Sequence, residues 1–361
     1  MKPSTTPSLS VSRRSWLRAA GLTSLGSALF SFARLRGQAA AQASGQADAH
    51  ASHGSAHGLG TVGQVSKDIF DPVRFLRAWN FNDLPPAERA KYYRETPRPD
   101  GTLLREYEFF AVDREIEIAP GIFYPAWTYN GQVPGPTIRA TEGDRLRIRF
   151  VNQGSHLHTI HFHGWHPPEM DGSLPEHQVP PGGTFVYEFD AEPAGLHLYH
   201  CHAVPLKRHI HKGLYGAFIV DPKGDDPTGR DDLVMIMNAF DTNFDSENEV
   251  YAVNTIANAY MTDPIRVVVG QPVRIYLVNI TEFDLLNSFH LHGMFFTVNR
   301  TGTARHAMEV TDTVMLCQGE RAILETTFRY PGDYMFHAHQ SEFAELGWMG
   351  LFRAEEAPRE T

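Results

Sequence analysis

From Leu103 onward, the pattern of hydrophobic and polar residues predicts short β-strands joined by turns. Over residues 145–150, arginine alternates with leucine, isoleucine and phenylalanine. A period of two places the apolar side chains on one face of a strand, so this segment predicts a half-buried strand. Turn signals rich in proline, glycine and acidic residues occur at 134–136 and 142–144. The segment beyond residue 103 is therefore predicted to be all-β.

The strand pattern occurs twice. Three pairs of segments correspond, 143–152 with 270–279, 161–164 with 290–293, and 199–202 with 336–339. The two members of a pair lie 127, 129 and 137 residues apart, which an internal duplication explains best. Each copy of a little over a hundred residues predicts one β-sandwich.

Composition divides the chain into five predicted parts. Arg13-Arg14 followed by an apolar run at 19–33 is typical of a twin-arginine export signal. The run is too short and too rich in Gly and Ser for a membrane span. We therefore expect a periplasmic or secreted protein whose mature chain has no membrane span. The parts are residues 1–43 (signal), 44–65 (disordered linker), 66–102 (arm), 103–224 (first sandwich) and 225–356 (second sandwich).

The formal net charge is −10, which disfavours nucleic acid as a partner. The chain has two cysteines, Cys201 and Cys317. Because Cys201 is assigned to a metal site below, no disulfide is expected, and Cys317 is predicted to be a buried apolar residue. The arm contains apolar stretches, and we expect it to pack against a neighbouring subunit.

Cys201 stands between His200 and His202 in the stretch Leu198–His202. On a strand, alternation sends the thiol to one face and the two imidazoles to the other. One backbone segment can then serve two metal centres. Copper is the metal that suits a thiolate and imidazoles in a trigonal site with a weak axial position.

The first copy alone can build the thiolate site. It offers His158 and His209 beside Cys201, whereas the second copy has Asn287 and Ala338 at the corresponding positions and no later histidine. His211 competes with His209, because on a strand-like segment the two would share a face. The residues alone leave both open.

Eight further histidines form four pairs at a spacing of two. They are too many for one or two tetrahedral zinc ions and suit a multinuclear copper cluster at a domain interface. A one-electron site connected through Cys201 to such a cluster suits the four-electron reduction of O₂ to water. The pairs are His161 and His163, His200 and His202, His290 and His292, and His337 and His339.

Residues 128–138, residues 158–164 and the His-Cys-His segment resemble the multicopper oxidases, and the layout resembles their two-domain, laccase-like members with blue copper in the first domain. The resemblance implies two cupredoxin-like Greek-key β-sandwiches and about four coppers per chain. It implies homotrimers in which the first domain of one subunit and the second of the next share each cluster. The implied ligands are His158, Cys201 and His209 for type 1 copper, His161 and His290 for type 2, and His163, His200, His202, His292, His337 and His339 for the type 3 pair.

Two more residues gain a role from the resemblance. Asp171, in the acidic segment 169–172, would help deliver protons to the cluster. Leu214 stands where many related sites have an axial methionine, and leucine cannot coordinate. A type 1 copper without axial sulfur should have a raised reduction potential.

The predicted function is oxidation of a small donor, phenolic, aromatic amine or metal ion, coupled to O₂ reduction. A copper nitrite reductase is the first alternative, since that family also forms trimers of two-domain chains. Its catalytic copper needs only three histidines, and it lacks the second flanking imidazole that His202 supplies here. A non-catalytic copper-binding or electron-transfer protein is the second alternative.

Overall fold

The computed structural model describes residues 70–77, 87, 90–304 and 308–357. All of them belong to one of two units of the chain, residues 60–361. The predicted export signal and linker, and most of the arm before residue 90, lie outside the described residues. No helix among the described residues is long and apolar enough to cross a membrane.

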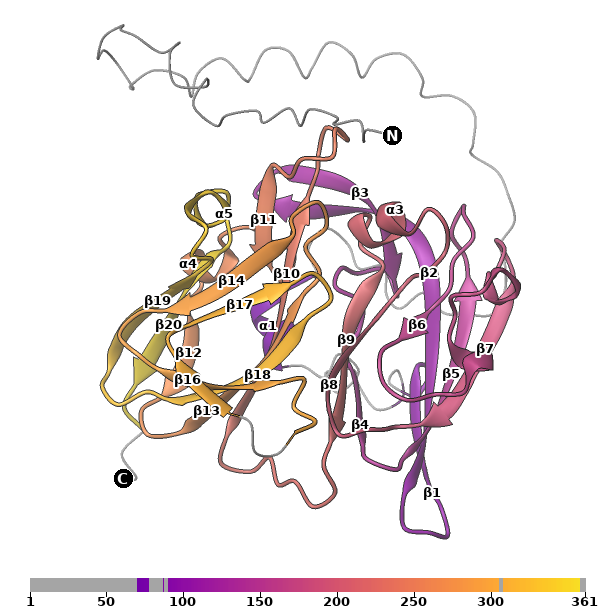
Figure 1. Cartoon of the computed structure of the whole chain (residues 1–361), viewed down its shortest axis with the longest axis horizontal. Helices are drawn as coiled ribbons and strands as arrows, with labels where there is room; N and C mark the ends of the chain where they lie inside the picture. Colours follow the sequence, from indigo (N-terminus) through magenta and orange to yellow (C-terminus); the bar gives the residue numbers. More distant parts are fainter. Residues whose placement is uncertain (1–69, 78–86, 88–89, 305–307, 358–361) are drawn as a thin grey trace, which may run out of the picture. The chain divides into compact units, whose positions relative to one another are not determined.

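The first domain consists of two β-sheets (Figure 1). The first sheet has the order β1-β2-β5-β7, with β3 paired to β2, and the second has the order β4-β9-β8-β6. Their bounds are β1 Tyr93–Pro97, β2 Leu103–Ala119, β3 Ile122–Tyr129, β4 Ile138–Thr141, β5 Arg145–Asn152, β6 His161–Phe162, β7 Thr184–Asp190, β8 Gly195–His200 and β9 Tyr215–Asp221.

The second domain, orange to yellow in Figure 1, also has two sheets, in the orders β11-β10-β13-β18-β15-β16 and β12-β20-β19-β14-β17. Its strands are β10 Asp231–Phe240, β11 Val250–Val253, β12 Ile265–Val268, β13 Pro272–Asn279, β14 Leu286–Leu291, β15 Phe296–Arg300, β16 Met308–Thr311, β17 Thr313–Cys317, β18 Arg321–Thr327, β19 Gly332–His337 and β20 Met349–Glu355. The described helices are α1 Pro72–Arg77, α3 Leu206–His211, α4 Ala259–Thr262 and α5 Ser341–Glu345, with short 3₁₀ turns η1 Pro168–Met170 and η2 Pro175–His177.

The predicted half-buried strand is confirmed as β5. Leu146, Ile148 and Phe150 are fully buried, whereas the intervening arginines face outward. These outward arginines pair with carboxylates of the neighbouring strands, Arg147 with Glu106 and Glu188. Apolar burial stabilises one face of the strand and exposed ion pairs stabilise the other. The burial contributes more than the ion pairs.

The duplication is visible in the strand pairing. Strand β5 runs parallel to β2 and antiparallel to β7, just as β13 runs parallel to β10 and antiparallel to β18. Strand β8 lies between β6 and β9, just as β19 lies between β14 and β20. The all-β prediction of two cupredoxin-type sandwiches is confirmed.

A third apolar core joins the two domains. Strands β8 and β9 are buried along almost their whole length because both of their faces are covered. Large side chains of the second domain pack against them, and each contributes roughly 1.5–3 kcal/mol on full burial. This core holds the two domains of one chain together. Its larger members include Leu196, Leu198, Tyr215, Ile219, Ile236, Phe240, Tyr276 and Ile280.

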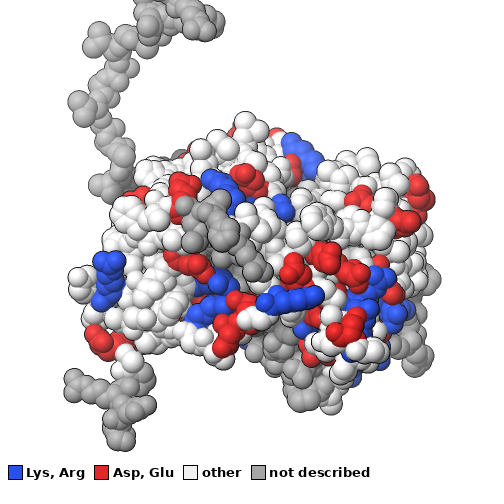
Figure 2. All heavy atoms as spheres, turned by 60° about the horizontal axis from the view of Figure 1, so that its bottom comes forward, with Lys and Arg blue, Asp and Glu red and all other residues white. Residues whose placement is uncertain are grey.

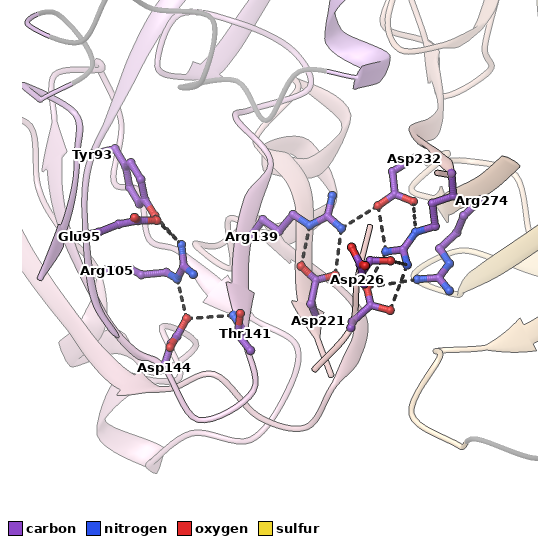
Figure 3. A network of polar contacts seen from close by, with 12 residues as sticks. Tyr93, Glu95, Arg105, Arg139, Thr141, Asp144, Asp221, Asp226, Asp232 and Arg274 are labelled. Atoms are coloured by element: carbon purple, nitrogen blue, oxygen red, sulfur yellow. Dashed lines mark hydrogen bonds and ion pairs between the residues drawn. The ribbon is translucent and has the colours of Figure 1, made fainter. Parts of the chain in front are cut away.

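A polar network reinforces the same junction (Figure 3). Arg139 of the first domain binds Asp221 and also Asp232 of the second domain, both at 2.7 Å. Arg230 joins Asp232 to Asp225 through contacts of 2.7 and 2.5 Å. Figure 2 shows acidic and basic side chains interspersed over one face of the molecule, so these charges are not segregated by sign there.

Helix α1 packs on its own chain. Phe75 belongs to the core between the domains and Leu76 to the core of the second domain. Arg77 donates to Asp231 at 2.8 Å and to the carbonyl of Arg266 at 2.6 Å. This part of the arm therefore packs against the second domain of its own chain, and the expected contact of the arm with a neighbouring subunit stays a prediction.

The prediction that Cys317 is buried is wrong. Cys317 ends β17, in which Val314 and Leu316 face the core, so the alternation of the strand turns the thiol outward. Its apolar neighbours in sequence gave the false signal. Both thiols of the chain are free.

Candidate metal centres

Cys201 follows the last residue of β8 and is fully buried. Its Sγ lies 3.3 Å from Nδ1 of His209 and 3.9 Å from Nδ1 of His158, and these two nitrogens are 3.2 Å apart. The structure thus brings the three predicted residues together. A thiol and two imidazole nitrogens that face one another, without an intervening hydrogen-bond partner, form the donor set that copper prefers.

The surrounding backbone shapes this site. The N–H of Thr159 points at Sγ of Cys201 at 3.4 Å, a contact that stabilises a thiolate. Gly154 passes so close to His158 that a Cβ would stand 2.9 Å from its Nε2, so a larger residue would displace the imidazole. Leu214 is fully buried in the apolar core that contains Cys201, and its carbonyl accepts the N–H of Cys201 at 2.9 Å.

Burial keeps the site ready for a metal. Burial lowers the pKa of His158 to about 3 and that of His209 to about 4, so both imidazoles are neutral at pH 7. Burial also raises the pKa of the Cys201 thiol. Metal binding must therefore expel the thiol proton, which couples metal affinity to pH.

The structure places His209, and not His211, at the thiol. Both residues lie on α3, and positions two apart on a helix point about 200° apart, whereas on a strand they would share a face. His211 instead accepts the N–H of Asp241, in the second domain, at 3.1 Å. Of the two histidines, only His209 therefore lies within contact distance of the Cys201 thiol.

The four cluster histidines of the first domain converge on one side of β8. His161 lies opposite His200 in the ladder of β6 and β8, and Nε2 of His163 is 3.3 Å from Nε2 of His200. The ring of His202 is 5.2 Å from that of His161. The alternation of His200, Cys201 and His202 does separate the thiol from the two imidazoles.

The second domain repeats this arrangement. His290 lies opposite His337, and Nε2 of His292 is 3.0 Å from Nε2 of His337. The ring of His339 lies 5.3 Å from that of His290. The two domains therefore present two similar sets of four imidazoles.

Carbonyl groups fix the orientation of four of these rings. The Nδ1 atoms of His161 and His200 donate to the carbonyls of Asp171 at 2.8 Å and Cys201 at 3.0 Å. The corresponding partners in the second domain are Asp312 for His290, at 2.9 Å, and Ala338 for His337, at 2.6 Å. Donation from Nδ1 leaves the Nε2 lone pair free for a metal.

Within the described part of one chain, the two sets do not meet. Each group of ligand atoms that lie within 4.8 Å of one another contains histidines of a single domain. In the second domain, His292 and His339 are exposed. The set of the second domain is thus open on one side.

The second domain lacks the thiolate site for a visible reason. Ala338 donates its N–H to the carbonyl of Trp348 at 3.2 Å, as Cys201 does to Leu214, and Trp348 donates to Phe343, as Leu214 does to His209. Phe343 and Trp348 therefore occupy the places of His209 and Leu214. The fully buried Trp348 indole fills this part of the core.

Asp171 lies at the edge of the first set. Its carboxylate is 3.2 Å from Nδ1 of His161 and 3.7 Å from Nε2 of His166, and it accepts a hydrogen bond from Ser173. Partial burial alone would raise the pKa of Asp171, but the Ser173 hydroxyl and the nearby imidazoles outweigh it and lower the pKa.

Sequence reasoning missed Trp127. This almost buried indole has its ring centroid 4.8 Å from His209 and 5.4 Å from His158. The only signal is its position, one residue before the motif at 128–138. A contact between an aromatic ring and two distant histidines is not encoded in local periodicity.

Known proteins share this architecture. Residues 113–225 and 227–358 each match a family described as multicopper oxidase. A crystal structure described as a multicopper oxidase is 50% identical, with a TM-score of 0.73, and the match covers 79% of this chain and 97% of that one. The copper-containing nitrite reductase of Neisseria gonorrhoeae is 27% identical over 266 residues, 68% of this chain and 67% of that protein. L-ascorbate oxidase of Cucurbita maxima is 40% identical over 126 residues, 32% of this chain and 20% of that protein.

The similar proteins include both oxidases and nitrite reductases. They agree with the buried thiol, its two imidazoles and the two histidine sets. The chain therefore belongs to the multicopper oxidase family, as a two-domain copper oxidoreductase with a type 1-like site in its first domain.

Proposed function

We propose that this protein oxidises a small electron donor at a type 1 copper held by His158, Cys201 and His209, and reduces O₂ to water at a trinuclear copper cluster. The single observation that carries the proposal is the fourth imidazole of the first domain. His202 points to the same side as His200, its ring 5.2 Å from His161. A nitrite reductase site needs only three histidines and has no use for it.

The chain contributes geometry and a path. Bound copper supplies the one-electron and multi-electron redox steps. Because His200 and His202 are the direct neighbours of Cys201 in the chain, an unbroken series of covalent bonds would connect the two copper centres. The carbonyl partners hold His161 and His200 so that no reorganisation is needed when electrons arrive.

We propose that each cluster forms between two chains of a homotrimer. Within one chain, the histidine set of the first domain does not meet that of the second. Large apolar residues that follow these histidines in the sequence are exposed. Trp165 and Val204, two residues after His163 and His202, are 68% and 72% exposed, and Phe295, after His292, is 64% exposed. Burying such apolar surface against a neighbour would stabilise the assembly and close the cluster.

Pairing of the rings then suggests how the ligands divide. His163 and His200 would hold one type 3 copper, with His339 of the neighbouring chain, and His292 and His337 the other, with the neighbour's His202. His161 and His290 would share the type 2 copper. Asp171, in contact with His161, would hold and release protons for O₂ reduction. Export through the twin-arginine route, with function in the periplasm or outside the cell, completes the proposal.

Copper content tests the proposal directly. About four coppers per chain, with type 1 and type 2 electron paramagnetic resonance signals and an EPR-silent pair, are expected for the fully loaded protein. O₂ uptake with a reducing donor should then account for four electrons per O₂. About two coppers per chain, with nitrite consumption in place of O₂ uptake, would establish the nitrite reductase alternative that the Neisseria relative brings.

A further inference from the structure

The imidazoles of the type 1-like site are screened from solvent. His158 is fully buried and His209 is 2% exposed. The Trp127 indole packs against both rings, with centroid distances of 5.4 and 4.8 Å, and is itself 5% exposed. A donor that approaches from this side meets the side chains around the indole before it meets a ligand.

Two exposed side chains, those of His156 and Arg208, cover the Trp127 indole. The ring of His156 lies 4.4 Å from that of Trp127. The Cζ atom of Arg208 stands 5.1 Å from the indole centroid, an arrangement typical of a cation–π contact. Arg208 directly precedes His209 on α3, so its charge is tied to the site by the backbone.

Two basic side chains lie on this side of the site. The formal net charge is −10, yet Arg208 and the almost buried Lys212 lie on this side, with Lys212 Nζ 4.8 Å from the Tyr124 ring. The carboxylate of Asp113 also lies nearby, where it accepts the hydroxyl and the N–H of Ser155. Among the described residues, no carboxylate forms an ion pair with Arg208.

We propose that Arg208 determines donor specificity, so that small donors carrying negative charge are oxidised in preference to cationic donors of similar reduction potential. This inference rests on the proposed electron entry at the type 1 site. The donor would bind beside Arg208 and His156 and give up one electron, which would pass the contact of Trp127 with His209 to a copper held by His158, Cys201 and His209. The oxidation state of the indole does not change, and a donor that is a metal complex releases no proton.

Lys207 provides a matched control. It has the same charge, is exposed, and lies one residue earlier on α3, but its Nζ stands over the Phe283 ring at 4.2 Å. Arg208→Glu and Lys207→Glu change the net charge of the protein equally. Only the first changes the charge above Trp127.

The first experiment is anaerobic stopped-flow reduction of the type 1 visible band in the holoenzyme. The donors are hexacyanoferrate(II) and the cationic complex hexaammineruthenium(II). Arg208→Glu should slow reduction by hexacyanoferrate(II) about ten-fold more than Lys207→Glu does, and should speed the cationic donor. In Arg208→Glu, the rate of reduction by hexacyanoferrate(II) should also depend less on ionic strength, a change that a merely structural role would not produce. Equal effects of the two variants would overturn the proposal.

Binding gives a second measurement that does not depend on turnover. Hexacyanocobaltate(III) is a redox-inert anion of similar shape, and its affinity for the holoenzyme can be measured by calorimetry. Arg208→Glu should raise its Kd about ten-fold and Lys207→Glu should leave it nearly unchanged. A Kd that neither variant alters contradicts a docking role for Arg208. Both measurements concern electron entry alone, so they can fail while the copper count and O₂ uptake still support the oxidase, and the reverse also holds.

Discussion

Nδ1 of His200 lies 3.0 Å from the carbonyl oxygen of Cys201, the residue that follows it, while the Cys201 thiol faces His209 on the other side of the chain. One residue therefore orients an imidazole of the first-domain histidine set and also carries the thiol of the type 1-like site. The second domain keeps the first half of this relationship, in His337 and Ala338, without the thiol.

Replacing the thiol should empty one site and spare the other. In Cys201→Ser, a hydroxyl takes the place of the soft ligand, so we expect the blue absorption band to vanish and copper content to fall by about one per chain. The cluster signals should persist. Cys317→Ser removes the exposed thiol of β17 and serves as the control, with no expected change in either property. A blue band that survives Cys201→Ser would refute the assignment.

Leu214 would occupy the axial side of a type 1 copper. Its side chain is fully buried in the core that contains Cys201, so Leu214→Met should bring a thioether to the site with little change of volume. We expect the reduction potential to fall by on the order of 50 mV, close to a ten-fold change in a one-electron equilibrium. Leu198→Met, a buried change on β8, is the control in the same redox titration. A potential that does not fall in Leu214→Met contradicts the axial role.

Subunit mixing tests the shared cluster. His163→Ala and His292→Ala each damage the cluster set of one domain, so each homotrimer should be inactive but keep its blue band. In a trimer that contains both variants, one of the three interfaces pairs two intact domains, and activity should recover to about a third of wild type. Co-expression with two affinity tags supplies the mixed trimers. Trimers that contain both variants and show no activity would place each cluster within a single chain.

Asp171 should affect O₂ reduction more than electron entry. Its carboxylate contacts His161 and His166, and the hydrogen bond from Ser173 and the imidazoles lower its pKa despite partial burial. Asp171→Asn keeps the shape but cannot take up a proton, so reoxidation of the reduced enzyme by O₂ should slow by about 10²-fold. Anaerobic reduction of the blue band should keep its wild-type rate. Glu169→Gln, in the neighbouring exposed position, is the control.

Local periodicity was sufficient for the fold and for the separation of ligands around Cys201, because both depend on the alternation of a strand. The repeat at 143–152 and 270–279 also reported the topology correctly. The choice between His209 and His211 required knowing that the segment is a helix. The exposure of Cys317 and the contact of Trp127 with both histidines depend on how sheets and loops pack, and no local pattern encodes such packing.

The network between the domains makes an acid-stability prediction around Asp232, which bonds Arg139 and Arg230 at 2.7 Å each. Burial alone would raise the pKa of Asp232, but these two guanidinium groups outweigh it and hold the pKa below its usual range. A lowered pKa in the folded state means that the unfolded chain binds a proton more readily. The carboxylate therefore stabilises the folded state at pH values above its unfolded pKa of about 4, and this contribution is lost as pH falls through the lower folded value.

Asp232→Asn removes this charge at constant shape. At pH 7 we expect it to lower the free energy of unfolding by about 1–3 kcal/mol, since two half-buried guanidinium groups each lose one of their carboxylate partners. Below pH 4 the difference from wild type should shrink, because the wild-type carboxylate becomes neutral as well. Urea unfolding midpoints of the copper-loaded protein across this range provide the measurement. Asp333→Asn breaks an exposed pair with Arg353 and should change the midpoint little at any pH. A deficit in Asp232→Asn that stays constant down to acid pH would show that the asparagine disturbs packing rather than charge.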